Sequence, residues 1–135
     1  MSKLIVLALF VVSFCSVVHA QDAVKADSKH YTVEFENDEV RVLRIKYGPH
    51  EKSIMHQHPN AVAIFVTDSN TKFSFPTGEP QTIPAKAGEV RWTPAATHLP
   101  ENLGDQPFEV ILVELKSKKS AKKMAQKPST TIAKK

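Results

Sequence analysis

The chain is predicted to be an all-β protein, folded as a small closed β-barrel or a two-sheet jelly roll. Residues 31–115 form a succession of short apolar-rich segments separated by turn residues, which is typical of β-sandwiches and barrels. About nine short strands fit this stretch, and no helix is expected inside it. An open sheet of this size would leave exposed edges, whereas closure removes them and encloses room for one ligand.

Each expected strand follows from its residue pattern. Residues 31–35 alternate with the period of two of a half-buried strand. Residues 40–47 also alternate, but their register shifts around Val42 and Leu43, which indicates a bulge or a change of sheet. Residues 61–66 are apolar at every position, and we expect a central strand covered on both faces. Later strands are expected around Phe73 and Phe75, Ile83, Val90 and Trp92, and finally Phe108, Val110 and Leu112.

The first twenty residues are typical of a secretory signal peptide. A basic start at Lys3 precedes an apolar stretch over residues 4–12, and small residues lead to a cleavage site after Ala20. A retained membrane anchor is the alternative, but the apolar run is short for a span. The protein is therefore expected to be exported, either periplasmic or secreted. Cys15 is the only cysteine, so the mature chain would have neither disulfides nor thiolate chemistry.

The positive charge of the chain belongs to its C-terminal end. Residues 21–115 carry nine Lys and Arg against fourteen Asp and Glu, a net charge of −5, whereas residues 116–135 carry eight lysines and no acid. Such a tail is expected to be disordered, and it either remains solvated or attaches to an anionic surface. The acidic domain, residues 30–115, is not expected to bind nucleic acid, because it shows no basic stripe.

Three histidines are the candidate functional residues. Residues two apart on a strand point to the same face, so His56 and His58 can direct two imidazoles at one point. If His98 arrives from a neighbouring strand, the three nitrogens can hold a metal ion and leave coordination positions open. The alternative is that they are ordinary polar residues at strand ends, which a single histidine would favour more than this set does.

The two histidine segments resemble the motifs of the cupin superfamily. The first motif places His-x-His after a glycine, here Gly48 followed by His56-Gln57-His58, and the second is matched by Gly88, Pro94, Ala96, His98 and Asn102. The resemblance covers roughly residues 30–115 and implies a double-stranded β-helix. The segments 88–94 and 101–105 look like those of small single-domain cupins, including β-alanine degradation protein-like and quercetin dioxygenase-like members.

The sequence departs from the cupin pattern at the metal ligands. Cupins commonly place a carboxylate ligand four or five residues after the second histidine, where this chain has Val62 and Ala63. The spacing from Gly48 to His56 is also longer by two residues, and His98 follows Pro94 one residue sooner. The resemblance therefore implies a three-histidine site for a divalent transition metal, with Fe²⁺ favoured and Zn²⁺, Ni²⁺, Mn²⁺ and Cu²⁺ as alternatives.

Three further residues are candidates for roles beside the metal. His50 precedes the histidine pair and is expected to be a proton shuttle, a fourth ligand or an exposed loop residue. Glu101 follows His98 by three residues and is a candidate to orient an imidazole or to act as a base. Arg91 has the geometry to bind a substrate carboxylate, and a surface ion pair is the alternative. His30 is expected to be structural.

Two functions of different classes fit these observations. The first is a metal-dependent dioxygenase acting on a small oxygenated or carboxylated organic molecule. Some cupin dioxygenases that cleave carbon–carbon bonds use three histidines alone, and this site resembles theirs. The second is a non-catalytic module that binds a small molecule or a metal and is tethered by the basic tail. The resemblance also implies a homodimer.

Overall fold

The computed structural model describes residues 21–117. The predicted leader, residues 1–20, and residues 118–135 of the lysine-rich tail lie outside the described residues. No helix within residues 21–117 is long and apolar enough to cross a membrane. The elements are β1 (Gln21–Asp22), α1 (Ala23–Ala26), β2 (Tyr31–Glu36), β3 (Val40–Tyr47), β4 (His56–His58), β5 (Ala61–Phe65), β6 (Ser69–Ser74), β7 (Gln81–Ala85), β8 (Val90–Thr93), β9 (Ala96–Asn102) and β10 (Phe108–Leu115).

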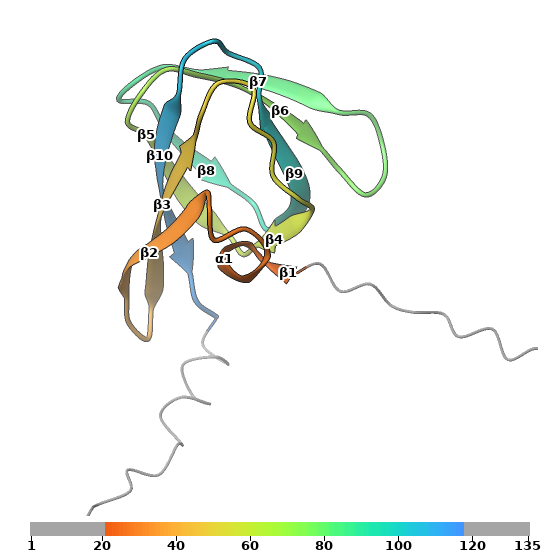
Figure 1. Cartoon of the computed structure of the whole chain (residues 1–135). Coiled ribbons are helices and arrows are strands. Elements are labelled where there is room, and N and C mark those ends of the chain that lie inside the picture. The colour runs from red at the N-terminus through yellow and green to blue at the C-terminus, as the bar shows by residue number, and fades with distance from the viewer. Residues whose placement is uncertain (1–20, 118–135) are drawn as a thin grey trace, which may run out of the picture.

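The strands form two five-stranded sheets, ordered β1-β4-β9-β6-β7 and β2-β3-β10-β5-β8. Figure 1 shows the second sheet on the left and the strands β4, β9, β6 and β7 opposite it. Strands distant in sequence lie side by side, since β10 pairs antiparallel with both β3 and β5. The predicted all-β fold is confirmed, and nine strands, β2 to β10, lie between residues 31 and 115 as expected.

The core lies between the two sheets and comes from alternating side chains. Strand β10 shows this most clearly, because every second residue from Phe108 is buried and the residues between are half-buried or exposed. The mainly aromatic and aliphatic core comprises Ala23, Tyr31, Leu43, Ile45, Tyr47, Ala61, Ala63, Phe108, Val110 and Leu112. Burial of these side chains is the main favourable contribution to folding.

The structure corrects one expectation about a strand. The apolar segment 61–66 was predicted to be covered on both faces, but only Ala61 and Ala63 are buried within β5. Ile64 is 36% exposed and Val66 is 45% exposed. The reason is that the fold has only two sheets, so the sheet that contains β5 packs against the other sheet on one face and leaves its second face outward.

A bulge occurs where the sequence predicted an irregularity. The register between β2 and β3 shifts from Val33 opposite Leu43 to Phe35 opposite Val42. The extra residue is Glu34 of β2, so the disruption seen in the pattern of β3 arises from its partner strand. As a result, Phe35 points to the outer face of the sheet.

Candidate metal centre

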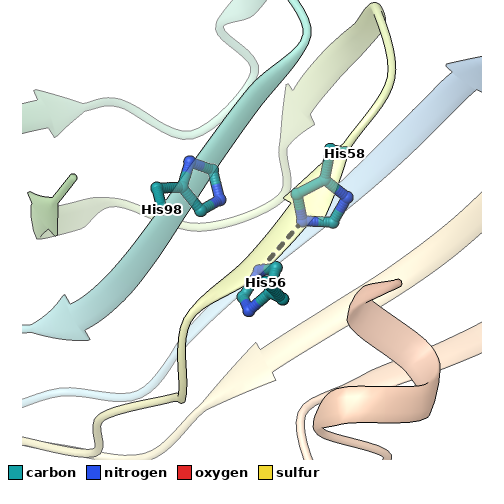
Figure 2. A group of neighbouring side chains, drawn as sticks. All are labelled: His56, His58 and His98. Atoms are coloured by element: carbon teal, nitrogen blue, oxygen red, sulfur yellow. Dashed lines mark hydrogen bonds between the residues drawn. The ribbon is translucent and has the colours of Figure 1, made fainter. Parts of the chain in front are cut away.

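Two neighbouring strands bring the three histidines together. His56 and His58 lie on β4, and the β4–β9 register places His56 directly opposite His98. Figure 2 shows the rings of His56 and His58 on one side of β4 and that of His98 reaching towards them from β9. One ring nitrogen from each residue lies within 4.8 Å of the others. His56 and His58 are buried, and His98 is half-buried.

The hydrogen bonds of the two β4 histidines direct their Nε2 lone pairs at a common point. Nδ1 of His56 lies 2.7 Å from the carbonyl oxygen of Ile54, and Nδ1 of His58 lies 2.6 Å from Oε1 of Glu114. Nδ1 of His56 therefore carries the proton of that ring, because a carbonyl oxygen only accepts, and this leaves its Nε2 free to accept a hydrogen bond or to bind a metal. The Nε2 atoms of the two rings are 3.1 Å apart, joined by the dashed line in Figure 2.

This geometry fits a metal ion. A metal ion bound to both Nε2 atoms would take the place of the proton that otherwise joins them in a hydrogen bond. Ligand nitrogens about 2.0–2.1 Å from one ion lie roughly 3.0–3.4 Å apart when adjacent, which matches the distance between the two Nε2 atoms. The donor set, three imidazoles, suits a divalent transition metal. His56, His58 and His98 can therefore hold a metal ion.

Burial keeps two of the ligands, His56 and His98, in the neutral form that metal binding requires. Burial and, to a smaller extent, the adjacent His58 together lower the pKa of His56 to about 4. Burial likewise lowers the pKa of His98 to about 3, with contributions from both neighbouring histidines. At neutral pH these rings offer lone pairs, so metal does not have to compete with protons.

Acidification of the metal-free protein is expected to weaken its folding. The pKa values of His56 and His98 are lower in the folded chain than the usual value of about 6.5. The unfolded chain therefore binds more protons as the pH falls below about 6.5, and stability is lost progressively down to about pH 4. We expect a loss of about 3 kcal/mol from His56 alone. Urea unfolding at a series of pH values measures it, and a flat profile would contradict neutral buried ligands.

A buried carboxylate supports His58 from behind. Glu114 is 1% exposed; its Oε1 accepts from Nδ1 of His58, and its Oε2 accepts from Nε of Arg41 at 2.6 Å. Arg41 also pairs with Asp22 at the start of the described chain. A carboxylate bonded to the outer nitrogen of a ligand histidine fixes the ring and strengthens its lone pair.

Sequence reasoning missed Glu114, although its signal is visible in β10. The strand reads Phe-Glu-Val-Ile-Leu-Val-Glu-Leu, and residue 114 falls on the same face as Phe108, Val110 and Leu112. An acid at an inward position of a buried strand calls for a partner. The pattern could have identified Glu114 as a buried acid, whereas its contact with His58 depends on the pairing of distant strands.

His56 is supported by a second polar network. Oγ of Ser53 lies 3.4 Å from Nδ1 of His56 and donates to Oδ2 of Asp27 at 2.5 Å. The same carboxylate oxygen lies 2.6 Å from Nδ1 of His30. His30 is buried and stacks on Tyr47, with ring centroids 4.1 Å apart. This placement agrees with the expected structural role of His30.

The metal centre opens on an apolar cavity of about 330 Å³ between the sheets. His58 and His98 belong to its lining, together with Arg91 of β8 and Thr71 of β6. Most of the remaining wall is aromatic or aliphatic and includes Tyr31, Ile45, Tyr47, Phe65, Phe73, Phe75, Ile83, Trp92, Phe108, Val110 and Leu112. A wall of this kind favours a ligand with an apolar body.

Arg91 lines the cavity but is already engaged. Its guanidinium lies over the ring of Phe65, 5.4 Å from the centroid. Nε and Nη2 donate to Oε1 of Glu89 at 2.8 and 2.6 Å, and Nη2 also donates to the carbonyl of Pro84. The ion pair weighed from the sequence is therefore present, in the wall of the cavity.

The structure does not bring His50 or Glu101 to the histidine cluster. The side chain of His50 is 63% exposed and pairs with Asp105 at 2.7 Å. Of the three roles expected for His50, this position fits the exposed loop residue, and it does not fit the proton shuttle or the fourth ligand. Glu101 lies an odd number of residues from His98 and therefore points to the other face of β9. There it pairs with Lys72 at 2.6 Å, and this hydrogen bond lowers the pKa of the Glu101 carboxyl.

The remaining motif residues have structural roles. Gly88 has a φ of 83° in the turn before β8, a conformation that favours glycine. Asn102 is 1% exposed, and its Nδ2 donates to the carbonyls of Gly48 and Gln106 at 2.9 Å. Asn102 therefore ties together the loops at one end of the two motifs.

Comparison with known proteins places the fold among the cupins. The structure is similar to a cupin domain from Bordetella pertussis Tohama I, with a TM-score of 0.60, 24% identity, and coverage of 64% of this chain and 92% of that one. It is also similar to an RmlC-like cupin family protein with a double-stranded β-helix fold from Methanocaldococcus jannaschii, with a TM-score of 0.52, 19% identity, and coverage of 73% and 89%. No family model and no curated protein matches the chain. The chain therefore has the cupin fold, a double-stranded β-helix with a three-histidine cluster at its centre.

Proposed function

We propose that this protein is a metal-dependent cupin dioxygenase acting on a small organic molecule with a largely apolar body and a head that bears oxygen donors. The observation that carries the proposal is the position of the cluster. Two of the three imidazoles that can hold a metal, those of His58 and His98, line an apolar cavity of about 330 Å³, so a bound molecule would present its head to the metal.

Ferrous iron is the favoured metal, with Zn²⁺, Ni²⁺, Mn²⁺ and Cu²⁺ as alternatives. Three protein ligands leave positions free, and a redox-active ion there supplies Lewis acidity and dioxygen activation. Both atoms of dioxygen enter the product in such a reaction, and the substrate supplies all four electrons. The chemistry therefore needs no separate reductant.

The residues of the chain would bind and orient the substrate. The rings of Tyr31 and Phe73 pack against the histidines, with centroids 4.8 Å from His56 and 4.9 Å from His98 respectively. They would exclude water from the side of the metal that meets the substrate. A substrate carboxylate at Arg91 would have to displace Glu89, so the contacts favour a substrate whose oxygen donors lie at the metal.

Oxygen consumption by the iron-loaded protein tests this function. The panel is chosen by head group and comprises 1,3-diketones, flavonols and thiol acids, with the zinc-loaded protein as the control. We expect consumption with at least one apolar oxygen chelator, no turnover with zinc, and one dioxygen consumed per product. Tight substrate binding without oxygen uptake would contradict the dioxygenase.

Tight binding without oxygen uptake would support a non-catalytic binding module. One observation favours this alternative: neither His50 nor Glu101, the acid–base candidates of the sequence, lines the cavity. Tyr31 and Tyr47 do line it, but burial raises the pKa of both hydroxyls. They are therefore poor proton donors at neutral pH.

Export and tail attachment are further parts of the proposal. Cleavage after Ala20 would leave Gln21 as the first residue, and Gln21 begins the strand β1 that pairs with β4. The lysines of residues 116–135 would then hold the domain at an anionic surface. Intact mass measurement of the mature protein tests the cleavage, and a mass that includes residues 1–20 would contradict it.

A further inference from the structure

Residues 21–29, which we call the N-terminal segment, lie directly beside the metal ligands of β4. The strand β1 pairs in parallel with β4 and places Gln21 opposite His56, and Figure 1 shows β1 and α1 next to β4. Ala23 is fully buried in the core, and Val24 packs against it. The segment is therefore packed onto the barrel, although it precedes both histidine motifs.

One set of polar contacts, the Asp22 network, runs from this segment to His58. Oδ2 of Asp22 accepts from Nη2 of Arg41, and its Oδ1 accepts from the backbone N–H of Val24 at 3.1 Å. Arg41 donates in turn to the buried carboxylate of Glu114, which bonds to Nδ1 of His58 at 2.6 Å. Asp22 thus holds Arg41 in the position from which its guanidinium pairs with Glu114.

A second set of contacts, the Asp27 network, runs from the same segment to His56. Oδ2 of Asp27 accepts the hydrogen bond of the Ser53 hydroxyl at 2.5 Å. Because the proton of that hydroxyl points at Asp27, the oxygen turns its lone pairs towards Nδ1 of His56, 3.4 Å away. This contact adds to the 2.7 Å bond from the same Nδ1 to the carbonyl of Ile54. Asp27 thus fixes the direction of the hydroxyl beside the ring.

Both aspartates are held in the ionised form that accepts these bonds. Burial raises the pKa of Asp27, but the hydrogen bonds from Ser53 and His30 outweigh it and lower the pKa overall. At Asp22 the effect of burial is likewise outweighed by the hydrogen bond from Arg41, so its pKa is also lowered. Hydrogen bonds to an ionised acceptor are roughly twice as strong as neutral ones. Each network therefore begins at a firm anchor in the N-terminal segment.

We propose that the N-terminal segment is a positioning element of the metal centre, in which Asp22 and Asp27 set the affinity for metal by fixing two of the ligand rings. This role rests on the metal centre of the proposed function and not on the dioxygenase reaction. A ring already held with its Nε2 directed at the site loses less freedom when an ion binds. The two networks share no residue, so their contributions should be independent.

The zinc affinity of the full chain tests the role of each residue. Ser53→Ala and Asp27→Asn should each raise the zinc dissociation constant about tenfold, the lower end of the effect of losing a group that orients a metal ligand. Asp22→Asn should cause a smaller rise, because two residues stand between it and the ligand. Competition with a chromophoric zinc chelator measures the three constants.

Double variants separate the two networks. Ser53→Ala combined with Asp27→Asn should bind zinc about as well as either single variant, since both changes break the same network. Asp22→Asn combined with Asp27→Asn should instead show the product of the two single effects. The same chelator competition measures both double variants.

Asp68→Asn is the matched control. The carboxylate of Asp68 has the same kinds of partner as that of Asp22, a cation and a backbone N–H, because it accepts from Nζ of Lys86 at 2.6 Å and from the N–H of Ala87 at 2.9 Å. None of these three residues lines the cavity of the metal centre. The variant loses the same charge as Asp27→Asn and should bind zinc as the unaltered protein does.

The absorption spectrum of the cobalt-loaded protein distinguishes positioning from folding. Its bands depend on the ligand geometry around the ion, so Asp27→Asn should shift them and Asp68→Asn should not. A role in folding alone would lower the urea midpoint of the metal-free protein. It would leave the cobalt spectrum and the zinc affinity of the folded protein unchanged.

Each contrary outcome has its own meaning. Failure of the unaltered protein to bind zinc would contradict the metal centre, and the positioning role with it. Normal zinc binding by Ser53→Ala and Asp27→Asn, in a protein that binds one equivalent, would contradict the positioning role alone. Binding by Asp68→Asn as weak as that by Asp27→Asn would assign the effect to net charge and overturn the proposal. Independent effects of Ser53→Ala and Asp27→Asn would contradict the Asp27 network.

Discussion

His98→Ala should reduce bound metal from one equivalent to less than about a tenth. His98 is the one ligand supplied by β9, and its removal leaves two imidazoles on β4. Two nitrogens alone hold a divalent ion far less tightly than three converging ones. Metal analysis of protein purified without added metal measures the change, and oxygen consumption should disappear with it.

His50→Ala is the matched control for that experiment. It removes a histidine of the same motif segment, but one that is exposed and paired with Asp105. The variant should keep its full equivalent of metal. Retention of metal by His98→Ala, or its loss from His50→Ala, would contradict this assignment of the ligands.

Arg41→Ala should destabilise the protein by about 3 kcal/mol or more, because it leaves the buried carboxylate of Glu114 without its cationic partner. The side chains of Glu114 and Arg41 are 2% and 17% exposed. The hydrogen bonds to Asp22 and Glu114 raise the pKa of Arg41 despite the opposing effect of burial. Urea unfolding of the metal-free protein measures the loss without the contribution of metal binding.

Arg44→Ala provides the comparison on the same strand. Arg44 also pairs with two carboxylates, Glu34 and Glu109, but on the outer face of β3 where the side chain is 33% exposed. Exposed pairs contribute about 0–1 kcal/mol. Equal losses for the two variants would contradict the distinction between a buried support of the metal centre and a surface ion pair.

The histidines could be identified from the sequence because their spacing carries geometric information. His56 and His58 share a face of any strand they occupy, and His98 lies in a segment that resembles the second cupin motif. The residues that bond to these ligands and fix their rings were not predictable in the same way. The contact between Glu114 and His58 joins residues 56 positions apart, and it depends on how β10 and β4 approach each other across the core.

The errors in the sequence reasoning have physical causes. Glu101 was considered for its distance from His98 along the chain, but the odd spacing on a strand places it on the opposite face. The apolar run 61–66 predicts burial on both sides of the strand. Its outer positions, Val62 and Ile64, instead lie on the outer face of the sheet, where Val62 is half-buried and Ile64 is 36% exposed.

X-ray absorption at the metal edge of the zinc-loaded protein tests the central claim most directly. The account predicts one ion with three imidazole nitrogens at about 2.0–2.1 Å and a remaining position filled by solvent or substrate. His58→Ala should reduce the imidazole count to two. A spectrum with no imidazole scattering, or with a coordination shell unchanged by that substitution, would contradict a metal centre built from His56, His58 and His98.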